Sequence, residues 1–198
     1  MKTNIITTCL LCAVLSANAG NTMSYRGIVY DVGLQFNEGQ YSVETFNAEA
    51  VRYDMSVISN ILRCNAVRIE GEDIGRLKQA TLLAHETGMK VFFNPWLMGA
   101  TADEVVTYMS EAATTAEELV RQGVDLTFVT GCEFSLFNKG IFEGNSINER
   151  LASMMNAMTE CNGDTLQMQL IKDECDRKLN AVLTRIVSAV RTKYSGPI

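Results

Sequence analysis

Residues 64–93 read CNAVRIEGEDIGRLKQATLLAHETGMKVFF, and this stretch decides the fold. It begins with a short apolar run, 64–69, and ends with another, 90–93, both rich in the β-branched and aromatic residues that favour strands. Between the two runs, four residues recur at helical spacing: Ile74, Leu77, Thr81 and Ala84. Gly88 is typical of a helix end. The stretch therefore predicts a strand, a helix and a second strand, the unit from which parallel sheets are built.

The same alternation continues on both sides of this stretch. Before it, we expect a strand at 25–32, a polar loop through Gly39 and a helix at 48–62. After it, we expect a long helix from a capping box at Thr101 and Glu104 to Gly123, a strand at 125–130, and a helix from a capping box at Ser146 and Glu149 to Met158. A last helix carries Leu179, Val182, Ile186 and Val190, and residues 193–198 are predicted to approach a fifth strand. About four strand–helix units in a row predict an α/β fold with parallel strands and helices packed against them.

Two architectures share this order of elements, an open doubly wound sheet and a (β/α)8 barrel. The open sheet is disfavoured because neither a G-x-G-x-x-G pattern nor a P-loop pattern follows the first strand. A complete barrel takes about 250 residues, and this sequence stops where a fifth strand would begin. We therefore expect an incomplete (β/α)8 TIM barrel, with residues 20–198 forming its N-terminal half.

The first residues are typical of a secretory signal peptide. Lys2 supplies a positive charge, residues 5–15 form a short apolar stretch, and residues 17–19 (ANA) match the small-x-small cleavage pattern. The apolar stretch is too short to span a bilayer, and no later segment reaches the necessary length. We expect residues 1–19 to be removed and the mature chain to be secreted and extracellular, with no membrane span.

Net charge limits the class of partner that we expect, and the cysteine content bears on disulfide formation. The net charge is −6 and no basic run is present, so nucleic acid is disfavoured as a partner. Of the six cysteines, four lie beyond the signal peptide: Cys64, Cys132, Cys161 and Cys175. An oxidising compartment predicts some disulfide pairing among them, and three connectivities stay open. The segment between Cys161 and Cys175 is rich in Asn, Gly and Asp, so this pair is suited to closing an excursion of the chain.

The sequence disfavours a catalytic or metal-binding histidine and favours a site built from carboxylates. His85 is the only histidine and lies in a predicted helix, so neither a catalytic triad nor a zinc site is expected; no metal site and no cofactor motif is predicted. Polar residues gather instead where the predicted strands end, the edge that carries the active site in parallel α/β folds. They are Asp31, Arg68, Glu70, Glu72, Asp73, Asn94, Trp96 and Glu133.

These residue types suit a carbohydrate, and each also has a structural alternative. Carboxylates perform general acid/base work on glycosidic bonds, amides and guanidinium groups bind hydroxyls, and an indole ring offers a stacking platform. Glu72 and Asp73, however, are equally suited to the first turn of a helix. Trp96 is as well suited to packing in the core, and Asp31 to a backbone hydrogen bond in its loop.

The stretch CNAVRI at 64–69 resembles the second strand of retaining (β/α)8 glycosidases, the large clan that includes cellulases. A closer resemblance is to a poorly characterised group of bacterial and fungal barrel proteins, loosely labelled abortive-infection proteins. It rests on Arg26-Gly27, Tyr30 to Gly33, the 64–69 strand, GCEFSLF at 131–137, Gly140 and Glu149-Arg150, with a weaker echo at 193–198. The resemblance implies that Arg68 orients a catalytic nucleophile and that Glu133 is the general acid/base.

On that interpretation, Phe134 and Trp96 would partly desolvate the Glu133 carboxyl, and Asp31, Glu70, Asn94 and Trp96 would bind substrate. The sequence departs from the clan at two points. Cys132 stands where the clan has an asparagine before its acid/base glutamate, and no seventh strand supplies the nucleophile. Glu70 is the nearest substitute.

Three interpretations stay open. The first is a secreted glycoside hydrolase-like protein whose nucleophile lies outside this chain. A second is a non-catalytic secreted protein that binds a glycan or a protein on the same scaffold. The third is an incomplete gene product or a half-barrel that must pair, because its first and fourth strands would be exposed edges. For this last case we expect self-association, aggregation or poor folding of the isolated chain.

Overall fold

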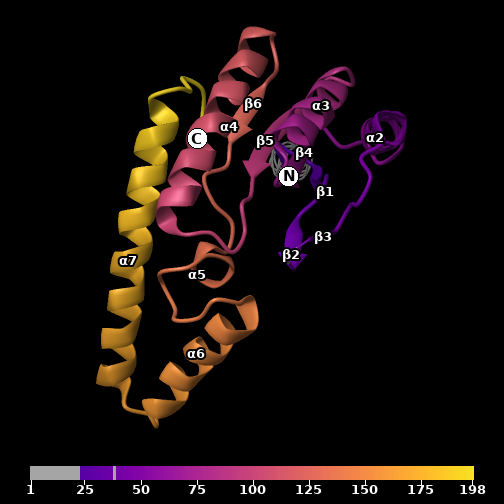
Figure 1. Ribbon diagram of the computed structural model, residues 1–198. Coiled ribbons are helices and arrows are strands. Elements are labelled where there is room, and N and C mark those ends of the chain that lie inside the picture. The colour runs from indigo at the N-terminus through magenta and orange to yellow at the C-terminus, as the bar shows by residue number, and fades with distance from the viewer. Residues whose placement is uncertain (1–22, 38) are drawn as a thin grey trace, which may run out of the picture.

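The computed structural model describes residues 23–37 and 39–198 (Figure 1). The predicted signal peptide lies outside these residues. The strands are β1 (Gly27–Asp31), β2 (Gln35–Asn37), β3 (Gln40–Tyr41), β4 (Ala66–Gly71), β5 (Lys90–Pro95) and β6 (Leu126–Phe128). The helices are α2 (Ala48–Ser56), which continues into a π-helical turn η1 (Val57–Ile61), α3 (Ile74–His85), α4 (Ala102–Arg121), α5 (Phe134–Phe137), α6 (Ile147–Glu160) and α7 (Thr165–Arg191).

The main sheet has four parallel strands in the order β1-β4-β5-β6. The prediction of a mixed α/β fold with a parallel sheet is therefore confirmed. The strands follow one another across the sheet in chain order, without a reversal. Because crossovers between parallel strands are right-handed, such an order carries the connecting helices to one face of the sheet.

Burial along the strands identifies that helix-covered face. Six alternating strand residues are at most 2% exposed: Val67, Ile69, Val91, Phe93, Leu126 and Phe128. They form one core with residues of α3 and α4, among them Leu77, Ala84, Val105 and Met109. Of the intervening side chains, Arg68, Glu70, Phe92 and Thr127 are partly buried and Asn94 is fully buried, while Val29 at the edge is 53% exposed. We call the surface formed by these intervening residues the open face.

Both predicted capping boxes are present. The Thr101 hydroxyl accepts a hydrogen bond from Glu104 N while the Glu104 carboxylate accepts from Thr101 N at 2.7 Å, and Ser146 and Glu149 repeat the arrangement at the start of α6. Each box satisfies backbone N–H groups that have no partner inside the helix. Both helices therefore begin at the predicted residue.

The C-terminal residues form no strand, but they lie along the free edge of β6. Phe128 N donates to Pro197 O at 2.9 Å. The buried Tyr194 hydroxyl donates to Leu126 O at 2.8 Å, and burial raises the pKa of Tyr194 to about 12. Residues 193–198, which were expected to approach a fifth strand, thus lie beside β6 without forming a strand themselves.

Three other expectations about the elements were incomplete. The loop through Gly39 contains an antiparallel hairpin, β2–β3, in which Gly39 has a φ of +75°. A short helix, α5, follows β6 where only a loop was expected. Finally, α7 begins at Thr165, well before the apolar repeat that predicted it, because Asp164 caps its first turn by accepting from Leu166 N and Gln167 N.

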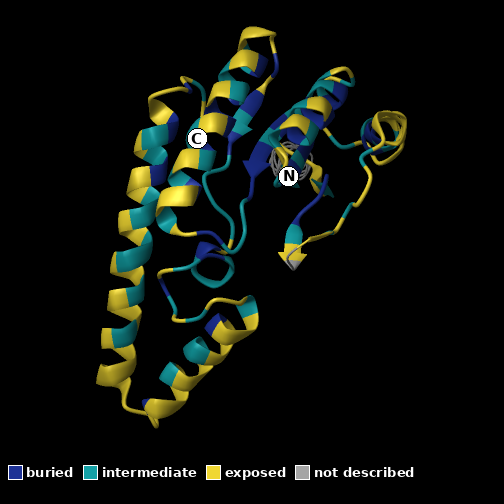
Figure 2. Ribbon diagram, in the orientation of Figure 1, coloured by how far each residue is buried: buried dark blue, intermediate teal, exposed yellow. Residues whose placement is uncertain are grey.

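The hairpin of α6 and α7 extends away from the sheet (Figure 1). Figure 2 shows that α6 and the first half of α7 are mostly exposed, in contrast to the buried strands. Their exposed apolar side chains include Leu151, Met155, Met158, Leu166 and Leu170. The apolar residues of this region thus pack little against the core, so their spacing did not predict the start of α7.

Candidate functional site

The site begins with the two central strands. β4 is displaced by two residues from its predicted range, so Glu70 lies in the strand and shares the open face with Arg68, two residues before it. On the next strand, Asn94 is the register partner of Glu70 and is fully buried. Parallel pairing therefore brings a guanidinium, a carboxylate and an amide together near the carboxyl end of the sheet. We call Arg68, Glu70, Asn94 and the neighbouring Cys132 the strand-end cluster.

Hydrogen bonds join the members of this cluster. Arg68 Nη2 donates to Glu70 Oε2 at 2.6 Å and to Cys132 Sγ at 3.2 Å, and Asn94 Nδ2 donates to the same Glu70 oxygen at 3.4 Å. Burial by itself lowers the pKa of Arg68, but the bond to Cys132 and the charge of Glu70 outweigh it, so the pKa is raised. The guanidinium stays charged and holds the Glu70 carboxylate in place.

Four buried polar atoms around the cluster have no hydrogen-bond partner among the described residues. They are Arg68 Nε, Glu72 Oε2, Asn94 Oδ1 and Trp96 Nε1. Glu72, Asn94 and Trp96 lie at the end of β4 or β5 or directly after it, and Arg68 lies in the middle of β4. Buried polar atoms are nearly always paired, and an unpaired one costs free energy. Ordered water molecules or a polar ligand supply the partners of such atoms in folded proteins.

Glu133 lies beside the cluster in sequence, but its carboxyl is not placed in it. It directly follows Cys132, is exposed, and adopts a left-handed conformation with a φ of 44° before the short helix α5. The desolvation expected from Phe134 and Trp96 is therefore wrong, because the side chain faces solvent. No hydrogen bond between Glu133 and Arg68 is found among the described residues.

Trp96 is only 8% exposed, so it offers no open platform for a sugar ring. Its ring meets that of Phe137 edge-on, with centroids 5.3 Å apart. The packing role was thus the correct alternative for this residue. Phe36, in the unforeseen β2–β3 hairpin, meets the same Phe137 ring at 6.0 Å and is 44% exposed. Sequence reasoning missed Phe36, whose only signal was an aromatic residue inside a polar loop.

Asp31 also takes its structural alternative. Its Oδ1 accepts a hydrogen bond from Gly33 N at 2.7 Å, which shapes the turn after β1. Asp31 is the register partner of Glu70 across the β1–β4 pair. It therefore lies at the rim of the cluster and shapes the loop there.

Glu72 and Tyr108 form a second polar pair near the same edge. Burial raises the pKa of Glu72, and the backbone N–H of Gln35 opposes the rise. The Tyr108 hydroxyl donates to Glu72 O at 2.8 Å, and burial together with the Glu72 charge raises the Tyr108 pKa. Glu72 is consequently more than a solvated residue in the first turn of a helix, while Asp73 is the N-cap of α3 as expected.

The cysteines correct another expectation. Cys64, Cys132, Cys161 and Cys175 are all free thiols. Cys64 precedes β4 and Cys132 follows β6, so these two lie at opposite ends of a parallel sheet. Cys175 lies about 15 Å along α7 from Thr165, given a rise of 1.5 Å per residue, whereas Cys161 caps α6 at the turn of the hairpin. Neither pair has the short Cα separation that a disulfide needs.

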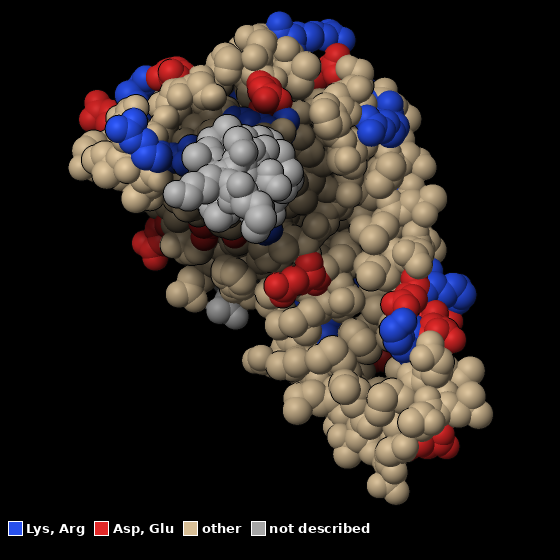
Figure 3. All heavy atoms as spheres, turned by 180° about the vertical axis from the view of Figure 1, so that it is seen from behind, with Lys and Arg blue, Asp and Glu red and all other residues tan. Residues whose placement is uncertain are grey.

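Charges of both signs are interspersed on the surface seen from behind, and the end formed by the α6–α7 hairpin carries few of them (Figure 3). No group of three or more His, Cys, Asp or Glu side chains suited to a metal ion occurs in the described ranges. Among those same residues, no helix has the length and apolar character needed to cross a membrane.

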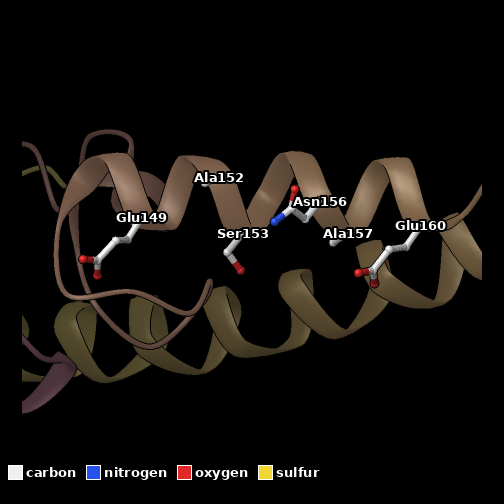
Figure 4. Close-up of a pocket in the computed structure, with 6 residues that line it drawn as sticks. All are labelled: Glu149, Ala152, Ser153, Asn156, Ala157 and Glu160. Carbon is white, nitrogen blue, oxygen red and sulfur yellow. The ribbon is translucent and has the colours of Figure 1, made fainter.

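A separate hollow lies along α6, in the hairpin. Figure 4 shows Glu149, Ser153 and Glu160 of this helix pointing toward the neighbouring α7, while Asn156 lies along α6 itself. It is an open groove, and none of the predicted site residues lines it. The residues singled out from the sequence therefore belong to the sheet edge and not to this groove.

Comparison with known proteins adds no relative to this picture: no protein-family model matches the chain, and no curated protein matches it.

Proposed function

We propose that the strand-end cluster binds a carbohydrate. The observation that carries the proposal is the set of four unpaired buried atoms, of which two are donors, Arg68 Nε and Trp96 Nε1, and two are acceptors, Glu72 Oε2 and Asn94 Oδ1. A sugar hydroxyl donates and accepts at once, so a ring with several hydroxyls suits a mixed set better than an anion or a cation does. The resemblance of residues 64–69 to the second strand of retaining glycosidases points the same way.

Binding is tested with the single tryptophan, Trp96, as the reporter. Trp96 follows Asn94 of the cluster by two residues, so we expect its fluorescence to change when neutral tetrasaccharides of β-1,4-linked glucose, mannose, xylose or N-acetylglucosamine are added. Asn94→Ala should weaken binding about tenfold, because a buried amide that contacts a ligand contributes about 1 kcal/mol or more. Asn60→Ala, on the outer surface of η1, is the matched control. Absence of binding to every sugar, also by calorimetry, would refute the proposal.

Glycoside hydrolysis is the second candidate function. Glu133 favours it, because a glutamate held at a φ of 44° is strained, and such strain is concentrated at functional sites. In this version Glu133 protonates the glycosidic oxygen and Arg68 orients the nucleophile. Retaining chemistry requires a second carboxyl about 5–5.5 Å from the first. Glu70 is the carboxylate of the cluster that would take that role, and it forms an ion pair with Arg68.

We also propose that the sheet is the first half of a (β/α)8 barrel. Its strand order follows the chain, its helices cover one face, and the C-terminal residues lie beside β6, as the start of a next strand would. The outer edge of β1 would then be a surface for self-association. Light scattering of the purified chain should show a dimer or larger species, and a stable monomer would contradict this. On the signal-peptide pattern of residues 1–19, we propose that the protein is secreted.

A further inference from the structure

A cavity of about 570 Å³ is lined by segments that follow the strands of the main sheet. Three segments supply its walls, and each follows a strand of the main sheet. The β2–β3 hairpin after β1 contributes Gln35 and Phe36, the loop after β5 contributes Met98, and the segment after β6 contributes Lys139, Asn145 and Asn148. The volume is in the range of pockets that hold small ligands. No residue predicted from the sequence as part of the site lines this cavity.

The walls of the cavity are tied to each other. Arg150, which is 1% exposed, donates to Leu136 O, Phe137 O and Gly144 O at 2.6, 3.1 and 3.2 Å. The buried Asn138 side chain donates to Leu97 O at 2.8 Å, which joins the segment after β6 to the loop after β5. A cavity whose walls are held by hydrogen bonds loses little conformational freedom on binding a ligand.

The lining favours a neutral polar ligand. Phe36 is 44% exposed and offers an apolar ring face, and Asn145 and Asn148 present exposed amides that donate and accept hydrogen bonds. The guanidinium of Arg150 is turned to backbone carbonyls, so it is not free to bind an anion. Lys139 is the other cation of the lining, and its positive charge helps to lower the pKa of Glu104.

Phe137 connects this cavity with the cluster. Its ring meets the ring of Phe36, which lines the cavity, at a centroid distance of 6.0 Å, and the ring of Trp96, two residues after Asn94 of the cluster, at 5.3 Å. We infer that the cavity holds one end of a neutral oligosaccharide whose other end reaches the strand-end cluster, with Phe36 stacking on a sugar ring and Asn148 binding its hydroxyls. This inference rests on the proposed carbohydrate function and assigns a second subsite to it.

The test compares variants of the cavity with matched controls in the full chain. Phe36→Ala should lower the affinity for the best tetrasaccharide at least tenfold, and Asn148→Ala three- to tenfold, both measured by Trp96 fluorescence and calorimetry. Tyr53→Ala removes an aromatic side chain that is 70% exposed on α2, and Asn156→Ala removes an amide of α6 that lines the groove of Figure 4; neither should change affinity. Because Asn148 is exposed, its replacement leaves the fold intact.

The number of sugar units provides a second readout. If two subsites act together, the tetrasaccharide should bind at least tenfold more tightly than the monosaccharide of the same sugar, and Phe36→Ala should remove most of that difference. Wild-type affinity in both cavity variants, with loss in Asn94→Ala, would overturn the second subsite and leave the proposed function standing. If the chain bound only an acidic oligogalacturonate, and Lys139→Ala abolished that binding, the inference that the ligand is neutral would be overturned. No binding of any sugar would refute the proposed function itself.

Discussion

Arg68 and Glu70 lie two residues apart on β4 and form an ion pair of 2.6 Å on the open face of the sheet. The Glu70 side chain is 12% exposed and that of Arg68 33% exposed, so the pair is largely withdrawn from water. An ion pair of this kind differs from a surface pair, because removing one partner leaves a charge with little solvation.

The first prediction concerns the stability of this pair. Arg68→Met should lower the free energy of unfolding by about 1–3 kcal/mol, because Glu70 keeps only its long bond to Asn94. The matched control is Arg52→Met, which breaks the exposed pair of Arg52 with Glu86 and should cost at most about 1 kcal/mol. Urea unfolding at pH 7 measures both. Equal losses of unfolding free energy in the two variants would mean that the Arg68–Glu70 pair stabilises the fold no more than a surface ion pair does.

A second prediction separates function from strain at Glu133. Glu133→Gln and Glu133→Gly should both abolish any cleavage of aryl glycosides, since both remove the carboxyl. The glycine variant alone should gain about 1 kcal/mol of stability, because glycine adopts a positive φ without strain. Glu143→Gln, an exposed glutamate of the α5–α6 segment, is the control for turnover. Turnover that persists in Glu133→Gln would remove this residue from the acid role.

Burial of Glu72 predicts a pH dependence of stability. Its pKa is raised above 4.5 in the folded chain, so the native state binds this proton more tightly than the unfolded state does. The stabilising contribution is complete below about pH 4.5, and it is lost as the pH rises through the raised pKa. Replacing Glu72 with glutamine should therefore flatten this part of the stability profile between pH 4 and 8. Glu111→Gln, exposed on α4, should leave the profile unchanged in urea titrations over the same range.

Arg150 should contribute strongly to the order of the segment after β6. Arg150→Met removes three hydrogen bonds to backbone carbonyls and takes this donor from Leu136 O and Gly144 O, whereas Phe137 O keeps its bond from Gly99 N; the loss should cost about 2–4 kcal/mol. Amide hydrogen exchange should show faster exchange at Asn138 and Lys139, whose N–H groups bond to Phe134 O and Ala100 O. The exposed Arg177→Met on α7 is the control. Unchanged exchange in this segment would show that Arg150 does not hold it.

The free thiols give a further chemical prediction. Alkylation in urea without a reductant should modify Cys64, Cys132, Cys161 and Cys175, and dithiothreitol should leave the unfolding midpoint unchanged. A disulfide that closed a long loop would instead stabilise the chain by about 2–4 kcal/mol. Mass spectrometry of the alkylated peptides distinguishes the two results. A peptide pair that stays linked until reduction would contradict the geometry of the two cysteine pairs.

Local patterns in the chain were sufficient for the framework of the sheet. The apolar runs near 64–69 and 90–93 and the helical repeat between them lie within one unit of the fold, so neighbouring residues alone specify them. The capping boxes at Thr101 and Ser146 are likewise local, because each bond joins residues three apart. Arg68, Glu70 and Asn94 were predicted at the correct edge because parallel strands end together.

The role of each site residue depended on partners far away in the chain. Cys132 joins the cluster only because β6 brings it near Arg68, 64 residues earlier. Phe36 belongs to the β2–β3 hairpin, and no alternation of apolar and polar residues in the sequence predicted this pair of strands. The first half of α7 was missed because its apolar residues face solvent and produce no clear core stripe.

The sequence by itself determined the alternation of strands and helices, the starts of the capped helices and the edge of the sheet where polar side chains collect. Only the tertiary structure decided that Trp96 is buried, that Glu133 is exposed and that Arg68 pairs with Glu70. The physical reason is that periodicity records which face of an element is apolar, whereas exposure and pairing depend on the register between strands and on loops that cover them from elsewhere in the chain.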